Sequence, residues 1–405
     1  MALRSKIKNF REMNSVGADL LKGVYPDFVY RNRFNFDQIP CFCFHDAKPG
    51  EIEPMLKYLK ENSYRTLRLE EFGAAVHGKF DLKQQKSVFL TFDDGVGSIW
   101  AVLYPLLKRY RFSATVFIVP GRIRFRSCYL PTLEDYWASN VPLDAIVSRD
   151  RSEEPFATWE EIIEMHESGV IDFDSHTLDH SLIFTSPRIV TFVNPAVLNE
   201  FHPFEFPRIR YGANSVVTVN QLGAPLFETA SRMSGICRFK DPIQLRDDCI
   251  RFVADRGGEL FFRSPAWQDE LMRFTSSHPD YRPGEALYES LGETREAINY
   301  QIKRAKELIE EMLPQKKSTH LCYPWGIGSE LACEVSQEIG YQYSYWTHSR
   351  ECRRTIRVGQ NPFYLDRLGP DFFYSLPGQG RKSFGDVLKK KLFRRLREGS
   401  PYLSH

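Results

Sequence analysis

The chain has 405 residues and a formal net charge of +2, with 42% hydrophobic and 26% charged residues. This balance is ordinary for a soluble folded enzyme and leaves room for one large domain with insertions, or for two domains. A nearly neutral charge gives no general argument for binding nucleic acid.

The N-terminal residues contain no long apolar stretch after their basic residues, so we expect neither a secretory signal nor a membrane span. The eight cysteines show no CxxC pair and no zinc-finger or dense disulfide spacing. Reduced thiols in a cytoplasmic protein are the simplest account, so we place the protein in the cytoplasm. Aromatic residues are abundant at 14%, and we expect most of them to pack in the core. The alternative is that some of them line a sugar-binding groove.

Short β-rich runs alternate with helical patterns along the chain. The runs that predict strands are 40–45, 87–92, 113–119, 170–173, 318–323 and 341–346. The patterns that predict helices are 55–62, 98–110, 158–169, 292–313 and 329–340. This alternation is typical of parallel βα units, so the expected fold class is α/β, either an open sheet or a barrel.

One long segment interrupts the alternation. Residues 183–290 are rich in Pro, Phe and Arg and carry no βα rhythm. We interpret them as an insertion and not as a separate catalytic domain. The expected organisation is therefore an N-terminal extension at 1–35, a catalytic region at 36–380 that contains the insertion, and a basic tail at 381–405.

Chemically active residues follow four of the predicted strands, at the point where each strand ends. In chain order they are His45, Asp46, Asp93, Asp94, Asp174, His176, His180, Pro324 and Trp325. Because the carboxyl ends of parallel strands gather at one face, we expect these residues to converge there.

The two histidines and the two adjacent aspartates predict a metal site. His176 and His180 are four residues apart, which would place both imidazoles on one side of a helical turn. Two imidazoles and one carboxylate leave a position for water, as in catalytic zinc sites. Asp93 and Asp94 repel each other, so we expect one to bind a cation and the other to act as general base. An isolated DDG is more often a turn, and only the combination supports this hypothesis.

At these motifs the sequence resembles the polysaccharide deacetylases, also called the NodB-homology or carbohydrate esterase family 4 group. TFDDG (91–95) and SHTLDH (175–180) resemble the first two motifs of the family, and CYPWG (322–326) resembles the third. The resemblance covers roughly 40–182 and 291–368. It implies a distorted (β/α) barrel of about seven strands. It also implies a metal-dependent hydrolase that removes N-acetyl or similar acyl groups from sugars.

The resemblance implies a role for each matching residue. Asp93 matches the general base. Asp94, His176 and His180 match the metal ligands, with zinc as the expected ion. The main-chain N–H of Trp325 matches the donor that stabilises the oxyanion.

The general acid of many members, a late histidine, has no counterpart in this chain. FCFHD (42–46) instead resembles the N-terminal histidine motif of the branch that deacetylates poly-N-acetylglucosamine. We therefore assign His45 as the general acid. The alternative is a strand-end histidine that only caps the barrel.

A further departure from the family pattern lies in the third motif and leaves other functions open. Many members have an arginine four residues before the third-motif glycine, where it orients the base, but this chain has Cys322. FFRSPAW (261–267) lies in the insertion and lacks the glycine, so Arg263 and Trp267 are assigned only as substrate contacts, together with Pro324. The alternatives are a deformylase of a lipid-linked amino sugar, and a non-catalytic glycan-binding protein on the same scaffold.

The C-terminal segment 383–399 is strongly basic, and its apolar residues recur every four positions at Phe384, Leu388, Leu392 and Leu396. Such a helix can lie on anionic lipids, so we expect peripheral contact with the inner membrane surface. The alternative is a helix that docks on the barrel by the same face. The other expected partner is an N-acylated sugar, glycan or lipid-linked glycan, and no nucleic acid.

Overall fold

The computed structural model covers the whole chain and describes residues 24–152, 154–200, 221–346 and 354–389. The chain divides into two compact units. The first contains 1–179, 301–327 and 336–401, and the second contains 180–300, 328–335 and 402–405. The domain boundaries expected from the sequence stay predictions.

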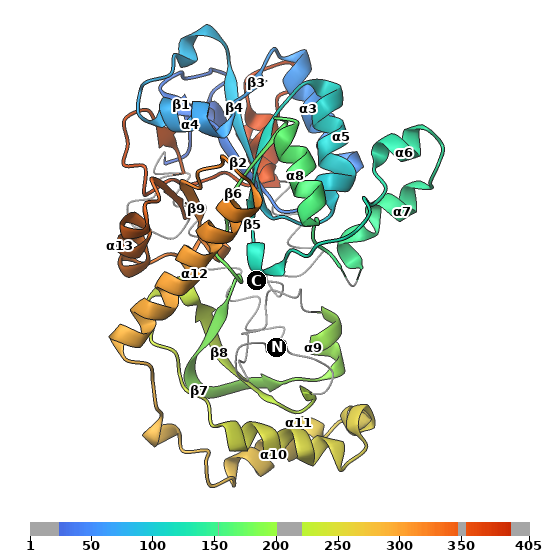
Figure 1. Cartoon of the computed structure of the whole chain (residues 1–405), viewed down its shortest axis with the longest axis vertical. Helices are drawn as coiled ribbons and strands as arrows, with labels where there is room; N and C mark the ends of the chain where they lie inside the picture. The colour runs from blue at the N-terminus through green and yellow to red at the C-terminus, as the bar shows by residue number, and fades with distance from the viewer. Residues whose placement is uncertain (1–23, 153, 201–220, 347–353, 390–405) are drawn as a thin grey trace. The chain divides into compact units, whose positions relative to one another are not determined.

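A parallel sheet of seven strands forms the centre of the first unit (Figure 1). Its order is β10-β9-β6-β5-β4-β2, and β3 pairs with β4 outside this path. The strands are β2 (Cys41–Phe44), β3 (Arg65–Thr66), β4 (Ser87–Asp94), β5 (Ala114–Ile118), β6 (Ile171–Ser175), β9 (His320–Cys322) and β10 (Tyr343–Tyr345). Every strand predicted from the sequence is present, which confirms the α/β fold class.

Residues 365–368 close this sheet. Leu365 bridges to Tyr345 on β10, and Leu368 bridges to Phe42 on β2, both in parallel. Main-chain hydrogen bonds of 2.8 to 3.1 Å join the segment to both strands. Because β10 and β2 are the two edges of the sheet, the expected distorted barrel is confirmed.

Helices cover the outer face of the sheet in the first unit. Those that pack on it are α3 (Pro49–Glu61), α5 (Tyr104–Tyr110) and α8 (Trp159–Glu167). The others are α2 (Asp27–Tyr30), α4 (Leu69–Val76), α6 (Leu133–Trp137) and α7 (Leu143–Val147), and a short antiparallel pair joins β1 (Gln38–Ile39) to β11 (Ile356–Arg357). The predicted helix at 98–110 begins as a π-helical turn at Ile99–Leu103 before it continues as α5.

Strand β4 separates two layers of core side chains. All its residues are buried, as expected for a central parallel strand that is covered on both faces. Val88 and Phe92 pack in the layer beneath α3, α5 and α8. Phe89 packs inside the barrel, where its ring stacks on Phe72 with centroids 4.1 Å apart. Asp93 has the same parity as Phe89, so the strand directs it into the barrel.

The second unit is built on an antiparallel pair, β7 (Leu182–Phe192) and β8 (Pro225–Ser231). Its helices are α9 (Pro195–Glu200), α10 (Ile243–Ala254) and α11 (Trp267–Ser276), and α12 (Leu291–Met312) and α13 (Glu330–Ile339) contain residues of both units. The core of this unit includes Phe184, Phe192, Phe227, Leu245 and Leu271. The antiparallel pairing explains why the βα rhythm stops in this part of the sequence.

The structure describes only the beginning of the predicted C-terminal helix. Residues 384–389 are helical. Phe384 packs against the core of the first unit and Val387 is buried, while Leu388 is 38% exposed. Leu392 and Leu396 lie outside the described residues. The first turn therefore docks on the barrel partly through Val387, and membrane contact by the whole segment stays a prediction.

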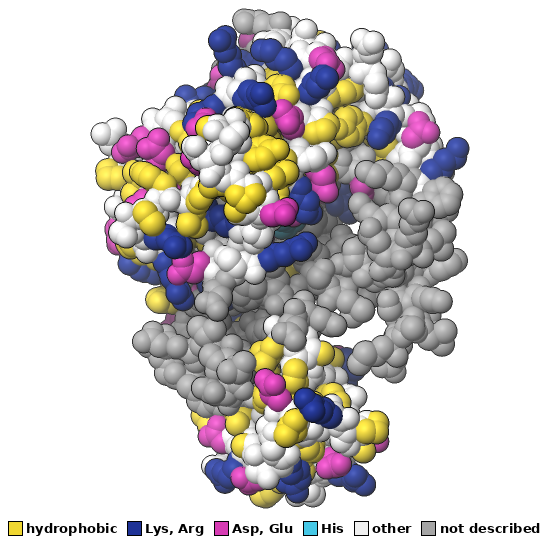
Figure 2. Space-filling view, turned by 90° about the vertical axis from the view of Figure 1, so that its right-hand side faces the viewer, with side chains coloured by type: hydrophobic (Ala, Val, Ile, Leu, Met, Phe, Trp, Pro, Cys, Tyr) yellow, Lys and Arg dark blue, Asp and Glu magenta, His cyan; other side chains and the backbone are white. Residues whose placement is uncertain are grey.

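Within the described ranges, no helix combines the length and the apolar character needed to cross a membrane. Figure 2 shows Lys and Arg side chains interspersed with Asp and Glu over the described part of one face. They do not gather into one large basic patch there, which agrees with the small net charge.

Candidate active site

Asp93, at the end of β4, is held by an arginine from the closing segment. Arg367 donates from Nη1 to Asp93 Oδ1 at 2.7 Å and from Nη2 to Asp93 Oδ2 at 2.6 Å. Nη1 also donates to Thr91 Oγ1 at 2.8 Å. The side chains of Asp93 and Arg367 are only 4% and 7% exposed. Two parallel charged hydrogen bonds fix the plane of the carboxylate.

The surroundings of Asp93 keep its carboxylate ionised. Burial by itself raises the pKa of Asp93, but the Arg367 guanidinium and then His176 lower it, so the net pKa lies well below its usual range. An ionised carboxylate can accept a proton, although so acidic a group is a weak base. Any contribution of Asp93 as a base therefore depends on its fixed position more than on its basicity.

Asp94, His176 and His180 form a buried group at the ends of β4 and β6. One ligand atom from each lies within 4.8 Å of the others. His176 Nε2 is 3.5 Å from Asp94 Oδ1. The structure thus brings the three predicted ligands together from one strand end and one continuous loop.

The two histidines come together for a different reason than the one predicted from their spacing. Residues 176–180 form an irregular loop, so the prediction that both imidazoles share a helical turn is wrong. Thr177 and His180 have positive φ angles of 63° and 53°, and Asp94 has a φ of 73°. Residues other than glycine seldom adopt this left-handed conformation, and such positions cluster at functional sites. The left-handed turns of the loop, and not a helix, bring the second imidazole back to the first.

The main chain of β9 orients the ring of His176. Its Nδ1 lies 2.8 Å from the carbonyl oxygen of Cys322, the last residue of β9. A carbonyl can only accept a hydrogen bond, so Nδ1 carries the hydrogen, and Nε2 on the side of Asp94 is the nitrogen that can bind a cation. Metal-binding histidines are usually held in this way.

The donor atoms of this group fit a divalent cation such as zinc. Two imidazole nitrogens and one carboxylate oxygen are common zinc ligands, and three protein ligands leave a position for water. Two ligands on a tetrahedral ion with bonds of about 2.1 Å lie roughly 3.4 Å apart. The 3.5 Å between His176 Nε2 and Asp94 Oδ1 is close to that separation.

His45 approaches the same carboxylate from the exposed end of β2. A ring nitrogen of His45, Cys43 Sγ and an oxygen of Asp93 lie within 4.8 Å of one another. His45 is exposed and Cys43 is half-buried. The structure therefore places His45 next to the predicted base, and its role as general acid stays a prediction.

The third motif forms a tight turn directly after β9. Pro324 is buried, and Trp325 and Gly326 have φ angles of 55° and 63°. Two consecutive left-handed residues reverse the chain immediately beyond Cys322, whose carbonyl orients His176. The assignments of the Trp325 N–H as oxyanion donor and of Pro324 as a substrate contact stay predictions.

Sequence patterns did not identify Arg367 as a site residue. Cys322 occupies the position of the arginine that the family pattern expects, and Arg367 Nη2 lies 2.9 Å from Cys322 Sγ. The closing segment 365–368 therefore supplies the guanidinium that the third motif lacks. The available signal was an arginine that lies between two leucines in YLDRLG (364–369), because a cation buried beside apolar residues needs a partner.

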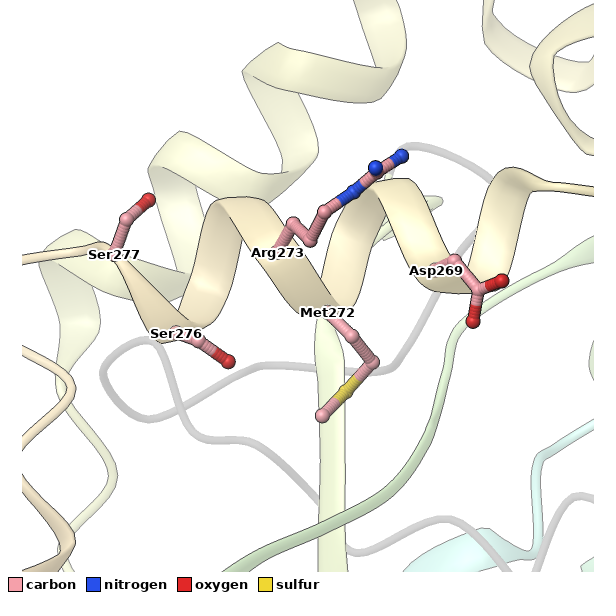
Figure 3. Close-up of a pocket in the computed structure, with 5 residues that line it drawn as sticks. All are labelled: Asp269, Met272, Arg273, Ser276 and Ser277. Carbon is pink, nitrogen blue, oxygen red and sulfur yellow. The ribbon is translucent and has the colours of Figure 1, made fainter.

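The second unit carries a surface pocket along α11 (Figure 3). Its volume is about 590 Å³, and it is lined by Asp269, Met272, Arg273, Ser276 and Ser277. No residue predicted for the site lines it. Trp267, at the start of the same helix, packs its ring against Phe262 with centroids 5.1 Å apart. The assignment of Arg263 and Trp267 as substrate contacts stays a prediction.

Residues 81–195 match the family model described as polysaccharide deacetylase. This segment contains β4 with its two aspartates and the loop with the two histidines. The similarity to polysaccharide deacetylases therefore lies in the segment that carries the first two motifs. The resemblance inferred from the motifs is therefore confirmed over this part of the chain.

The similarity to curated relatives covers only part of this chain and only part of each relative. Poly-beta-1,6-N-acetyl-D-glucosamine N-deacetylase of Staphylococcus aureus (strain MSSA476) is 29% identical over 140 residues, which are 34% of this chain and 39% of the relative. The chain thus spans about two fifths of the length of the curated relatives that it matches first.

Two solved structures align with most of the chain at low sequence identity. A de-N-acetylase from Aggregatibacter actinomycetemcomitans aligns with a TM-score of 0.49 and 16% identity, over 87% of this chain and 99% of that one. IcaB from Ammonifex degensii aligns with a TM-score of 0.46 and 16% identity, over 85% of this chain and 98% of that one.

Proposed function

We propose that this protein is a metal-dependent hydrolase that removes an N-acetyl or similar acyl group from an amino sugar during the synthesis of a surface polysaccharide or glycolipid. The observation that carries this proposal is the position of Asp93, which is ionised and fixed by Arg367 directly beside the ligand group of Asp94. The family of residues 81–195 and the named activity of the S. aureus relative support the same reaction.

The chain's own residues suggest how the acyl group would leave. When bound, a divalent cation supplies Lewis-acid chemistry, which makes an acyl carbonyl more electrophilic and a water molecule more acidic. Asp93 takes the proton from the attacking water, while Arg367 keeps its carboxylate in place. The Trp325 N–H donates to the oxyanion. His45, which must be protonated at this step, donates to the departing amine.

The cation proposed for the site is zinc, held by Asp94, His176 and His180. The support is the chemistry of the donors, because imidazole nitrogens with one carboxylate favour zinc over calcium or magnesium, which prefer oxygen ligands. The Nδ1 hydrogen bond from His176 to the Cys322 carbonyl would keep the imidazole ready to bind.

The proposed substrate is an N-acylated amino sugar within a glycan or a lipid-linked glycan. The S. aureus relative is named for poly-β-1,6-N-acetyl-D-glucosamine, and a glycan of this class is a reasonable first substrate to test. We further propose a cytoplasmic location with peripheral contact between residues 383–399 and the inner membrane surface, where a lipid-linked substrate would be anchored.

A purely glycan-binding role is less well supported than hydrolysis. The lack of a third-motif arginine was the main reason to consider it, and Arg367 provides a guanidinium to the same carboxylate. A deformylase would use the same residues, so only the identity of the released acid separates the two hydrolases.

The test is to incubate the full-length zinc-loaded protein with N-acetylglucosamine oligomers, acylated nucleotide sugars and lipid-linked glycans, and to quantify the acetate and formate released. We expect acetate, lost on chelation and restored by one equivalent of zinc. Asp93→Asn should keep the one tightly bound zinc ion while the rate falls by about 10²–10⁴-fold. Asp144→Asn, at an exposed position of α7, is the matched control and should not change the rate. Formate alone would indicate a deformylase, and no released acid from any substrate would contradict the proposal.

A further inference from the structure

A second group of atoms that could hold a metal ion includes Asp93 itself. Cys43 Sγ, a His45 ring nitrogen and an Asp93 oxygen lie within 4.8 Å of one another. None of these is a ligand in the group formed by Asp94 and the two histidines of the loop. Cys43 Sγ is 3.4 Å from Asp93 Oδ2. Sulfur and oxygen ligands of one tetrahedral zinc ion lie about 3.6 Å apart, given bonds of 2.3 and 2.0–2.2 Å.

We propose that Cys43, His45 and Asp93 form a second site for a soft divalent cation such as Zn²⁺ or Cd²⁺, which binds more weakly than the first ion and inhibits the enzyme. The binding depends only on these three side chains. The inhibition rests on the proposed function, because the second ion would occupy the residues assigned as general base and general acid. Excess zinc would then switch off an enzyme that needs one zinc ion.

Solvent access favours Cys43 over the other thiol near Asp93. Cys322 Sγ lies 3.7 Å from Asp93 Oδ2 and forms a further group with Asp93 and His176. Cys322, however, is fully buried. Cys43 is half-buried and His45 is exposed, so an ion that arrives from water meets this pair first. His176 is also already part of the first group.

The charges around Asp93 make the second ion the weaker one. A carboxylate offers about four lone-pair positions, of which the two N–H groups of Arg367 occupy two and the Cys322 thiol contacts a third. A cation would replace the hydrogen of the Cys43 thiol at Oδ2, so Asp93 can still coordinate. Cys43 must first release to water the proton that it donates toward Asp93, which weakens the binding of the ion. The guanidinium of Arg367 repels the incoming cation. The second site should therefore fill only after the first.

Cobalt spectroscopy tests the site directly. Apo full-length protein is titrated with Co²⁺, and the near-ultraviolet charge-transfer absorption from thiolate to cobalt is followed. The first equivalent should give no such band, because Asp94, His176 and His180 provide no sulfur. Further equivalents should give the band. Cys43→Ser, or Cys43→Ala if serine perturbs folding, should abolish it.

Two other cysteine variants serve as matched controls. Cys128→Ser removes an exposed thiol and Cys322→Ser removes the buried neighbour, and both should retain the band. Absence of the band in the unmodified protein at several equivalents would overturn the proposal. Its persistence in Cys43→Ser, or its loss in either control, would overturn it as well.

Activity provides the second readout. Excess zinc should inhibit the unmodified protein, and Cys43→Ser should need at least about tenfold more zinc for the same inhibition, which corresponds to the loss of one ligand. Hydrolysis without the thiolate band would refute the second site and leave the proposed function standing. The band without hydrolysis of any substrate would support the site and refute the function.

Discussion

Asp93 and Arg367 form a buried ion pair that joins residues 274 positions apart in the sequence. Removing one partner of a buried pair leaves a charge without compensation, which costs about 3–5 kcal/mol. The pair also determines where the carboxylate points, because each oxygen of Asp93 accepts a separate N–H from Arg367. Stability and catalytic geometry are therefore coupled at this one contact.

Replacing Arg367 by alanine should lower the free energy of unfolding by about 3–5 kcal/mol. It should lower kcat at least about 100-fold, because a carboxylate misplaced by an ångström loses its alignment with the reacting water. Arg367→Lys keeps the charge without the two parallel hydrogen bonds, so it should recover more stability than kcat. Urea unfolding and acetate release measure the two effects.

Two further variants make the test of Arg367 specific. Arg357→Ala removes an exposed arginine on β11 and should change neither quantity. Cys322→Arg combined with Arg367→Ala returns a guanidinium to the neighbouring family position and should recover part of the lost kcat. Wild-type kcat in Arg367→Ala would refute the positioning role.

Replacing His45 by alanine should lower kcat strongly on an N-acetyl amide but much less on an activated aryl ester. An amine must be protonated as it leaves, whereas an activated phenolate need not be. Parallel kinetics of the two substrates measure the difference. His77→Ala, which removes a histidine from the end of α4, is the control. Equal losses on both substrates would show that His45 is not the acid.

At the scale of elements, the ends of strands and the loops that follow them build the site. Strand β4 directs the Asp93 side chain into the barrel. The next residue, Asp94, has a positive φ, so its carboxylate departs from the alternating directions of strand side chains. The segment after β6 brings its two histidines together by left-handed turns, and β9 contributes a carbonyl that orients one of them. Each of these elements therefore positions a site residue that its neighbours in the sequence do not position.

The second unit has its own buried charge cluster, in which Glu289 accepts hydrogen bonds from Arg232 and Arg238. Burial alone raises the pKa of Glu289, but the hydrogen bonds from Arg232 and then Arg238 lower it, so the net pKa lies below its ordinary value of 4.5. A lowered carboxylate pKa stabilises the fold above pH 4.5, and this stabilisation is lost as the pH falls through the folded pKa.

Replacing Glu289 by glutamine should therefore destabilise the protein by about 3 kcal/mol at pH 7, because two arginines lose their counter-charge. The difference from wild type should shrink as the pH falls below 4.5, where the unfolded chain takes up the proton, and should vanish once the pH passes the lowered pKa of the folded carboxylate. Urea unfolding at several pH values measures both. Glu285→Gln, whose side chain is 72% exposed, should behave like wild type. An undiminished difference at low pH would contradict this account.

At the scale of the whole molecule, the barrel depends on a closing segment near the C-terminus. Residues 365–368 bond to both edge strands and carry Arg367 into the interior. The beginning of the last helix follows soon after, with Val387 buried and Leu388 exposed. Because the first turn docks on the barrel, contact with a membrane would have to come from the rest of the basic segment.

We expect the full-length protein to sediment with anionic liposomes at low salt and to be released at high salt, since each cation near an anionic surface contributes about 1 kcal/mol. Changing Lys389, Lys390 and Lys391 to glutamine should weaken binding while keeping Val387 in place. A version that ends at Gly380 should not bind. Neutral liposomes are the control, and failure of the full-length protein to bind anionic liposomes would refute the membrane contact.

Sequence alone determined six of the seven strands of the parallel sheet, five of the described helices, the α/β class, the resemblance to deacetylases and the residues that meet at the predicted metal group. These follow from local periodicity and from short motifs whose members are close in the chain. One local inference failed: spacing at i and i+4 suggested a helical turn at His176, but spacing does not specify φ, and Thr177 is left-handed.

Only the tertiary structure decided which residue holds Asp93, where the barrel closes, and that Cys43 and His45 meet at the same carboxylate. These contacts join segments far apart in the chain, and their formation depends on the order and register of the whole sheet. No local pattern encodes that Leu365 and Leu368 lie between β10 and β2. Since Arg367 enters the barrel only through this closure, its partnership with Asp93 could not be predicted from either motif alone.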